Sequence, residues 1–461
     1  MDKLNFDTYL SPFSWRYGSH EMRKIWSEEN KRKVWRTIWV ELAKAQHKAG
    51  IITREELKDI ENHKDNIDIK RAHEIEKEIY HDLMAEIKTY AEQCKIGGGK
   101  IHLGATSMDI VDNADLLLTK KSLDLIKSKL KEVIKNFEKQ IRKYKNTPCM
   151  GYTHLQPAEP TTIGYRLSLY AQDLLWDFEF IEKIESFIKG KGIKGAVGTS
   201  ASYEHLLKDT KMNSFDLEKE VMKNLKIDAV DVSGQTYPRK IDLLIIEALA
   251  NIASSLHKFS FDLRIMQSPN FGEWSEPISK KRVGSSAMPF KKNPDKAEKI
   301  CSLCRFASSL FQVAWSNPAM SLLERTLDDS AAKRVFMPEA FLAIDECLKT
   351  TNSIIKDLVI FENVIKVNLK KYGIFSSTES LMMGLVKRGA DRQGVHEAIR
   401  ENSMLAWKNV SSGKENNLIE LLIKDKRINK YIKGEEILKY FTPEKHTGNA
   451  RERTERFLKK L

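Results

Sequence analysis

The chain has 461 residues, of which 41% are hydrophobic and 31% are charged, a balance that excludes a wholly disordered protein and allows a large core. Its net charge of +13 favours an anionic partner, but basic and acidic residues are interleaved and no nucleic-acid motif accompanies them, so we expect a small anionic substrate and no nucleic acid. No apolar run is long enough to cross a bilayer and no signal peptide is present, so we expect a cytoplasmic protein without membrane contact.

Apolar residues recur with helical spacing along most of the chain. Thr53 and Glu56 have the spacing of a capping box, which predicts the start of a short helix. From residue 107 to 144 there is almost no helix breaker, and a helix of that length would be about 55 Å long. We predict an all-α protein with an elongated helical bundle, with helices over 22–49, 69–94, 107–144, 161–188, 237–266, 295–316 and 332–357.

Glycine, serine and polar residues interrupt the helical pattern in three segments, and loops of this kind between rigid helices often carry functional sites. These segments cover residues 98–107, 147–162 and 268–294. After residue 360 we expect shorter helices. We therefore predict an N-terminal helical domain over 1–106, a central long-helix bundle over 107–360 and a C-terminal helical domain over 361–461.

The five cysteines are too few and too scattered to indicate a disulfide framework. Cys301 and Cys304 form a CxxC pair inside a predicted helix, without a second pair that would complete a zinc site. We interpret them as two thiols packed on one helix face, with a metal or redox site as the alternative.

Residues 284–294 form the most specific string in the chain. A glycine followed by Ser285 and Ser286 allows a tight turn that presents backbone N–H groups. Lys291 adds a cation and Asn293 a neutral donor, so the segment can bind a carboxylate or a dianion. A flexible lysine-rich loop without such a role is the alternative.

This string resembles the defining pattern of the fumarase/aspartase superfamily, GSSxMPxKxNP. The resemblance implies that superfamily's fold, a β-elimination that releases fumarate, and no metal or organic cofactor. It also implies that Ser285 removes a proton from the substrate as general base, while Lys291 and Asn293 bind the substrate carboxylates. A serine hydroxyl is a weak base in water, so this role requires a water-excluded site, which closure of the segment 268–283 would supply.

His154 lies within residues 153–157, in a break before a predicted helix. A loop histidine taken alone is more often structural or solvated. This segment, however, resembles the second superfamily motif, which implies that His154 is the general acid that protonates the leaving nitrogen and that Thr153 binds substrate. Imidazole suits proton donation near neutral pH. Glu298 resembles the carboxylate that pairs with this histidine in the family.

His81 and Asp82 fall within a predicted helix, where spacing alone predicts surface residues. The segment resembles the family pattern RHDV, which implies that His81 approaches the substrate and that Asp82 belongs to the binding site. Tyr80 stands where arginine is usual, which leaves the role of His81 open. Thr106 and Ser107 resemble the first motif, which implies carboxylate binding, and they also suit the cap of the following helix.

Further segments resemble the adenylosuccinate lyase family. They are Trp15-Arg16-Tyr17, Gln235-Thr236-Tyr237 followed by Arg239-Lys240, and Glu324 to Ser330 with Arg334. The resemblance implies that these segments bind a nucleotide, and guanidinium groups suit its phosphate because they offer paired donors. The implied contacts are Arg16, Tyr17, Gln235, Arg325, Ser330 and Arg334. Surface ion pairs are the alternative for each arginine alone, but three segments in the family's order favour the nucleotide.

The resemblance spans about residues 11–340 and implies a lyase that cleaves adenylosuccinate to AMP and fumarate, and also the succinylated aminoimidazole carboxamide ribotide, in purine biosynthesis. It implies a homotetramer whose active sites combine loops from three subunits. Two departures concern substrate contacts: residues 291–295 are closer to the string of argininosuccinate lyases, and Ser200 stands where some adenylosuccinate lyases carry glutamine. Argininosuccinate lyase is therefore the nearest alternative, and a non-catalytic helical protein or a nucleic-acid binder are alternatives from other classes.

Overall fold

The computed structural model describes residues 6–278, 286–288 and 290–461. The chain forms two compact units, each built from separate stretches of sequence. Unit 1 comprises Met1–Lys131, Trp176–His257 and Ile300–Thr350, and unit 2 comprises Glu132–Leu175, Lys258–Lys299 and Thr351–Leu461. These units are sets of residues that contact one another. The predicted domains 1–106, 107–360 and 361–461 are parts that would fold separately, so the two divisions are not equivalent. The domain boundaries stay a prediction.

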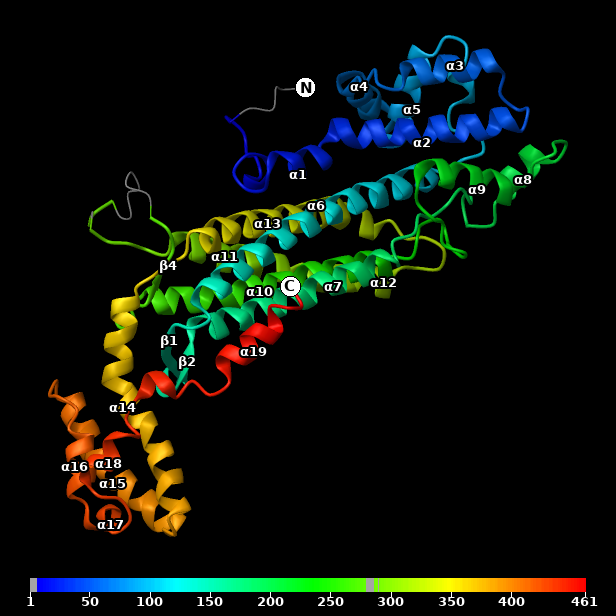
Figure 1. Cartoon of the computed structure of the whole chain (residues 1–461). Coiled ribbons are helices and arrows are strands. Elements are labelled where there is room, and N and C mark those ends of the chain that lie inside the picture. Colours follow the sequence, from blue (N-terminus) through cyan, green and yellow to red (C-terminus); the bar gives the residue numbers. More distant parts are fainter. Residues whose placement is uncertain (1–5, 279–285, 289) are drawn as a thin grey trace. The chain divides into compact units, whose positions relative to one another are not determined.

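Long helices dominate the described residues and confirm the predicted all-α fold (Figure 1). They are α6 (Ser107–Tyr144), α7 (Ile163–Glu185), α10 (Lys240–Gln267), α11 (Asp295–Ser309) and α13 (Asp328–Lys356). Helix α6 matches the predicted range at both ends, and Leu123 and Ile126 are among the side chains that it buries completely. Within unit 1, α6 and α13 lie side by side, joined by Lys129 and Asp345 at 2.5 Å (Figure 1).

The N-terminal part of unit 1 is also helical. Its helices are α1 (His20–Ile25), α2 (Glu28–Lys48), α3 (Arg54–His63), α4 (Ile69–Ile79) and α5 (Asp82–Gln93), and later in the chain come α8 (Ala201–Leu207), α9 (Ser214–Leu225) and α12 (Phe311–Met320). Helix α2 packs against α3 and α9, and α4 packs against α5 (Figure 1). The predicted capping box is confirmed, because Thr53 and Glu56 each accept the other's backbone N–H.

Several predicted helices are interrupted, each within a few residues. The helix predicted over 22–49 breaks at Ser27, whose hydroxyl caps α2. The helix predicted over 69–94 is two helices, because Tyr80 has a φ of 53° and ends α4 in the left-handed conformation. The helix predicted over 295–316 divides after α11, where serine hydroxyls donate to carbonyls of the preceding turn.

A buried charge network joins α2 to α5. The side chains of Arg32, Arg36 and Glu86 are at most 1% exposed. Glu86 accepts hydrogen bonds from Arg32 Nη1 at 2.6 Å and from Arg36 Nε at 2.7 Å. Arg36 also donates to the carbonyl of Asn66 at 3.1 Å. Because buried guanidinium groups require a counter-charge, Glu86 holds α5, and with it the helix start next to His81, against α2.

We expect Glu86→Ala to lower the free energy of unfolding by about 3–5 kcal/mol, because it leaves two buried cations without their carboxylate. Urea denaturation followed by circular dichroism measures this change. Glu29→Ala is the matched control on α2, since it removes an exposed partner of Lys33 and should leave the midpoint nearly unchanged. Equal losses in the two variants would contradict the structural role given to Glu86.

Unit 2 contains a β-hairpin where the sequence predicts an irregular break over 147–162. Its strands are β1 (Pro148–Thr153) and β2 (Gln156–Thr162), and a second short sheet pairs β3 (Trp274–Ser275) with β4 (Val359–Ile360). Cys149 and Met150 are fully buried on β1, and the hairpin packs against α14 (Glu362–Lys387). The predicted break in the helical pattern is confirmed, but the segment is a paired hairpin and not an irregular loop; a search for helical spacing does not detect strand pairing, and the two prolines of β2 weaken its strand signal.

The C-terminal helices of unit 2 enclose an apolar cluster that includes Leu381, Leu385, Ala398, Leu418 and Leu422. The helices after α14 are α15 (Arg392–Ser411), α16 (Leu418–Lys424), α17 (Lys426–Asn429), α18 (Gly434–Leu438) and α19 (Ala450–Phe457). Short 3₁₀ turns are η1 (Pro12–Ser14), η2 (Gly98–Lys100) and η3 (Pro443–Lys445). The expected shortening of helices after residue 360 holds only from α16 onward, because α14 and α15 are long.

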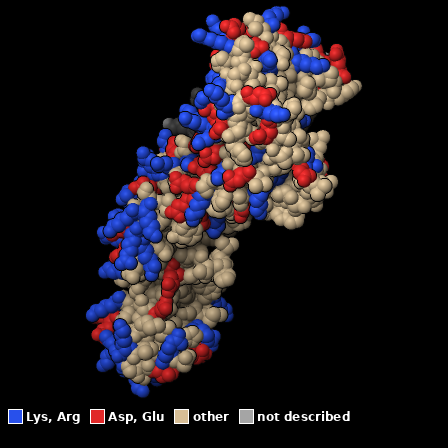
Figure 2. Space-filling view, turned by 90° about the vertical axis from the view of Figure 1, so that its right-hand side faces the viewer, with Lys and Arg blue, Asp and Glu red and all other residues tan. Residues whose placement is uncertain are grey.

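The structure describes three features that the composition bears on: the cysteines, the surface charges and the apolar character of the helices. All five cysteines are buried, and the Sγ atom of Cys304 lies 3.7 Å from that of Cys347 on α13. On the face shown in Figure 2, basic and acidic side chains are interspersed. Within the described ranges, no helix combines the length and the apolar character needed to cross a membrane.

A pair of carboxyl groups on β2 and α14 makes stability depend on pH. A hydrogen bond with Glu379, together with its charge and with burial, raises the pKa of Glu159. A raised folded-state pKa stabilises the fold below the unfolded pKa, and this contribution is lost as pH rises through the folded value. We expect Glu159→Gln, which mimics the protonated form, to raise the thermal midpoint at about pH 7.5 and to change it little at about pH 4. Equal gains at both values, measured by circular dichroism, would refute this.

Candidate active site

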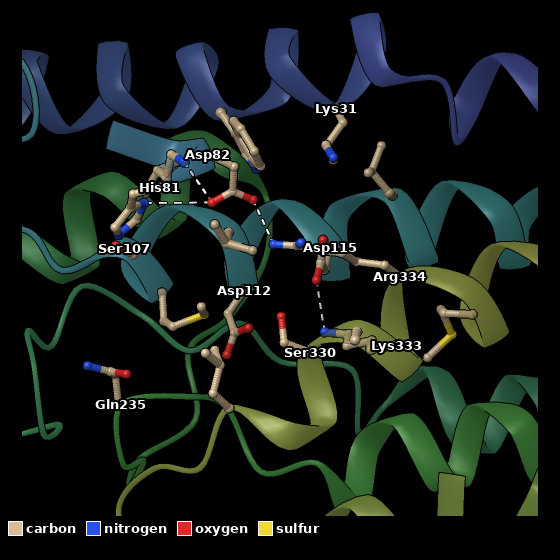
Figure 3. Close-up of a pocket in the computed structure, with 18 of the residues that line it drawn as sticks. Lys31, His81, Asp82, Ser107, Asp112, Asp115, Gln235, Ser330, Lys333 and Arg334 are labelled. Carbon is tan, nitrogen blue, oxygen red and sulfur yellow. Dashed lines mark hydrogen bonds and ion pairs between the residues drawn. The ribbon is translucent and has the colours of Figure 1, made fainter. Parts of the chain in front are cut away.

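Unit 1 contains a cavity of about 800 Å³ whose walls come from distant parts of the chain (Figure 3). The walls are the start of α2, the α4–α5 junction, the first turns of α6, the segment before α10 and the first turns of α13. The predicted site residues that line it are His81, Asp82, Thr106, Ser107, Gln235, Arg325, Ser330 and Arg334.

The α4–α5 junction presents His81 to the cavity (Figure 3). Tyr80 turns the chain out of α4, and His81 becomes the N-cap of α5, where its Nδ1 accepts the Met84 N–H at 3.3 Å. This bond needs an unprotonated Nδ1, which assigns the proton of the neutral ring to Nε2. The prediction that His81 lies inside a continuous helix is therefore wrong, because the residue caps a helix at the cavity wall.

Asp82 and Arg334 meet across the cavity rim. Arg334 Nη2 on α13 lies 2.6 Å from Asp82 Oδ2 on α5. The other oxygen of Asp82 accepts the Leu83 N–H at 2.7 Å and lies 3.7 Å from His81 Nδ1. Two residues predicted from separate segments, Asp82 and Arg334, are therefore paired directly, and His81 lies beside them (Figure 3).

Arg239 connects the segment before α10 to α6 and α13 through a buried network. Its Nε donates to Asp329 Oδ2 at 2.6 Å, and its Nη2 donates to Asp112 Oδ1 at 3.1 Å. Asp112 also accepts the backbone N–H of Tyr237 at 2.8 Å. Burial opposes the charge of Arg239, but Asp112 and neighbouring groups outweigh it and hold the pKa of Arg239 well above its ordinary value.

Lys333 adds a second buried tie between the same elements. Its Nζ donates to the hydroxyl of Tyr237 at 2.6 Å and lies 2.9 Å from Asp115 Oδ2 on α6 (Figure 3). The Tyr237 hydroxyl in turn donates to Asp242, a carboxyl whose pKa burial raises against the opposing charge of Lys333. These bonds fix the first turns of α13, and Ser330 lies one turn before Arg334 on that helix.

The Gln235 segment is tied to the loop before α13 through the backbone. The N–H of Gln235 donates to the carbonyl of Glu324 at 3.0 Å. Gly234 is required at this contact, because a Cβ built there would lie 2.5 Å from the same carbonyl oxygen. Two segments that resemble nucleotide-binding sequences are therefore joined directly.

A buried carboxylate holds the start of α6, where Thr106 and Ser107 line the cavity. Asp109 accepts the Thr106 N–H at 3.0 Å and the hydroxyl of Tyr203 at 3.2 Å, and it is ion-paired with Lys191. Asp109 and Lys191 are both fully buried. The cavity wall there is thus anchored to the segment that precedes α8, and capping of α6 by the Thr106 or Ser107 hydroxyl stays a prediction.

Arg16 and Tyr17 lie in unit 1 but do not line the cavity. The Arg16 guanidinium is 5.7 Å from the centre of the Trp15 ring and 5.9 Å from that of Tyr17. The backbone of this segment is held by Arg23, whose Nη1 donates to the carbonyl of Tyr17 at 3.2 Å. The structure therefore places these two residues close to each other, and their predicted contact with a nucleotide stays a prediction.

His154 lies at the exposed tip of the β1–β2 hairpin in unit 2. Thr153 pairs with Gln156, so His154 and Leu155 form the turn, with φ values of 54° and 59°. Positive φ at both central residues is typical of a type I′ turn, which favours glycine and asparagine. A leucine in this conformation is strained, and such strain often accompanies functional segments.

Glu298 lies in the first turn of α11, also in unit 2. Its Oε1 is 3.8 Å from Arg264 Nη2 on α10. The start of this helix is capped by buried Glu276, which accepts the Ala297 N–H at 3.2 Å. Within one chain, the described residues include no ion pair between Glu298 and His154, so that predicted pairing stays a prediction.

The serine-bearing string is described only in part. Ser285, the predicted general base, lies outside the described residues. Lys291 is exposed and donates its backbone N–H to the carbonyl of Met288 at 3.0 Å, and Asn293 is half-buried. The roles predicted for Ser285, Lys291 and Asn293 therefore stay predictions.

Comparison with known proteins identifies the family. The family described as "Lyase" matches residues 15–307, and the family described as "Adenylosuccinate lyase C-terminus" matches residues 375–457. Adenylosuccinate lyase from Saccharomyces cerevisiae is 38% identical over 99% of this chain and 95% of the yeast protein. The enzyme of the same name from Schistosoma mansoni is 38% identical over 91% of this chain and 88% of its own.

The chain belongs to the adenylosuccinate lyase family. A solved fumarate lyase from Mesorhizobium sp. BNC1 has a TM-score of 0.85 with 22% identity, and the match covers 98% of this chain and 100% of that one. At this identity the likeness shows a shared fold alone, and it confirms the predicted fumarase/aspartase-like fold. Membership of the adenylosuccinate lyase family confirms the resemblance but leaves the roles of single residues as predictions.

Resemblance to adenylosuccinate lyases did not point to several residues that line the cavity. Asp112 and Asp115 follow Asp109 at intervals of three in the first turns of α6, between apolar residues such as Ile110 and Leu116, and this acidic stripe was a usable signal of a buried polar face. Lys31, which extends from α2 towards the cavity in Figure 3, had no such signal among the 77 basic residues of the chain.

The strained turn predicts a stability gain. Leu155→Gly removes the Cβ that disfavours a φ of 59°, so we expect it to raise the free energy of unfolding by about 0.5–1 kcal/mol. Leu155→Ala is the matched control, because it removes the same exposed side chain and keeps the Cβ. Urea denaturation compares the two, and a glycine variant no more stable than the alanine variant would show that the turn is not strained.

Proposed function

We propose that this protein cleaves adenylosuccinate to AMP and fumarate by β-elimination, and that it cleaves the succinylated aminoimidazole carboxamide ribotide of purine biosynthesis in the same way. The observation that carries the proposal is the cavity of unit 1, which gathers Arg325, Ser330 and Arg334 with His81 and Ser107. The relatives named adenylosuccinate lyase support this choice of substrate, because they match nearly the whole chain.

The chemistry of the cavity fits a nucleotide phosphate. Guanidinium groups bind phosphate through paired, charge-assisted hydrogen bonds. Arg239 Nη1 and Arg325 Nη2 are buried nitrogens without a hydrogen-bond acceptor among the described residues, and buried donors of this kind are rare unless a ligand or water satisfies them. Ser330 and Arg334 add a hydroxyl and an exposed guanidinium from one face of α13.

The proposed elimination divides the proton transfers between two groups. Ser285 takes a proton from the substrate's β-carbon, and the electron pair of that bond forms the double bond of fumarate as the carbon–nitrogen bond breaks. His154 gives a proton to the departing nitrogen. Lys291 and Asn293 stabilise the negative charge that develops on the adjacent carboxylate, because fixed donors in a water-excluded site favour the charged intermediate.

Thr106 and Ser107 complete the proposed carboxylate site at the start of α6. Their position at a helix N-terminus favours an anion, because backbone N–H groups and the helix dipole point towards it. No step in the proposal requires a metal or an organic cofactor.

We further propose a cytoplasmic homotetramer in which loops of three subunits form each active site. Large apolar side chains are exposed on α7, α10 and α12, and exposed groups of this kind often lie at subunit contacts. They include Trp176, Phe261, Phe311 and Trp315. Assembly of this kind would bring the hairpin tip of one subunit to the cavity of another.

Fumarate release from adenylosuccinate by the pure protein, with AMP formed in equal amount, tests the function. We expect Ser285→Ala and His154→Ala each to lower kcat by about 10²- to 10⁴-fold, because each removes one proton transfer. Ser286→Ala and His205→Ala are matched controls, since the first alters the neighbouring hydroxyl and the second an exposed histidine of α8.

The outcomes separate the alternatives. Near-wild-type turnover in either catalytic variant would remove that residue from the mechanism. Fumarate release from argininosuccinate, with none from adenylosuccinate, would replace the proposed substrate. No fumarate from either substrate would contradict the proposed reaction as a whole.

A further inference from the structure

Every basic side chain that lines the cavity is already paired with an acid. These side chains are Lys31, Arg239, Arg325, Lys333 and Arg334. Each has a nitrogen within 3.3 Å of a carboxylate oxygen. Arg239 and Arg325 still have one unpaired nitrogen each, whereas an anion that binds Arg334 competes with the carboxylate of Asp82.

The pairs differ in how much water reaches them. The side chains of Arg239, Arg325 and Lys333 are 5%, 16% and 8% exposed, so separating them from their acids would leave buried charge. The side chain of Arg334 is 62% exposed and that of Asp82 is 28% exposed. Water and salt screen an exposed pair, so it contributes little stability and can be exchanged at small cost.

Asp82 has a hydrogen-bond donor other than Arg334. Its Oδ1 accepts the N–H of Leu83 at 2.7 Å at the start of α5. The carboxylate therefore keeps this hydrogen bond after an anion takes Arg334.

We propose that Asp82 is an internal counter-anion of Arg334 that the ligand's phosphate displaces, so that it determines how strongly binding depends on that phosphate. This inference rests on the proposed function, in which a nucleotide enters the cavity. A phosphate with nearly two negative charges competes well with a single carboxylate for the guanidinium. A neutral nucleoside offers Arg334 no anion in exchange and leaves the pair intact.

Calorimetric titration with AMP and with adenosine tests the role of Asp82. Asp82→Asn keeps a hydrogen-bond acceptor at the start of α5 but removes the competing charge. We expect AMP to bind about two- to fivefold more tightly to this variant, the range that an exposed ion pair allows, while the affinity for adenosine stays unchanged. Asp82→Ser, which also suits a helix start, serves if the asparagine variant does not fold.

Two controls isolate the ion pair from general charge. Glu76→Gln removes an acid that lines the same cavity and has no ion-pair partner among the described residues, so it should not tighten AMP binding. In an Arg334→Gln background, Asp82→Asn should give no gain, because the pair is already broken.

Weaker AMP binding by Asp82→Asn, an equal gain for adenosine, or the same gain from Glu76→Gln would overturn the inference. Wild-type protein that does not bind AMP would overturn it as well. The fumarate assay separates failure of this inference from failure of the proposed function. If the wild-type protein releases fumarate but Asp82→Asn does not bind AMP more tightly, only the counter-anion role of Asp82 is refuted.

Discussion

The buried charges of Arg239 and Lys333 are the constraint on which the cavity depends. Cations with so little access to water are tolerated only beside their carboxylates, and those carboxylates lie on α6 and α13. Arg239 and Asp112 are 127 positions apart in the sequence, so each bond fixes elements that no local interaction could align. The position of Ser330 at the cavity follows from the same bonds.

This buried network and the cavity rim have different roles. The ion pairs of the buried network stay together because breaking any one of them would leave a buried charge without its counter-charge. The network therefore forms a rigid wall of the cavity. The rim carries the exposed pair of Asp82 and Arg334 beside His81, which caps α5, so ligand charge can be exchanged there without disturbing the wall. Glu86 supports the rim indirectly, because its hydrogen bonds to buried arginines fix α5 to α2.

The sequence predicted the long helices and the lyase fold well, because periodic apolar residues such as those of 107–144 report directly on burial. It failed where one residue ends a helix: neither Tyr80 in a left-handed conformation nor His81 as a cap has a strong local signal. Family strings found many cavity residues, whereas Lys31 and Lys333 depend on three-dimensional pairing that spacing does not encode. The strained hairpin turn was missed because strand pairing, not turn composition, imposes it.

The most direct test of the central claim is an experimental structure of the assembled protein with AMP bound. We expect the phosphate to lie in the unit 1 cavity against Arg334 and Ser330, with Asp82 separated from Arg334 and the bonds from Arg239 to Asp112 unchanged. AMP bound outside this cavity, or a cavity whose buried pairs separate when AMP enters, would contradict the claim.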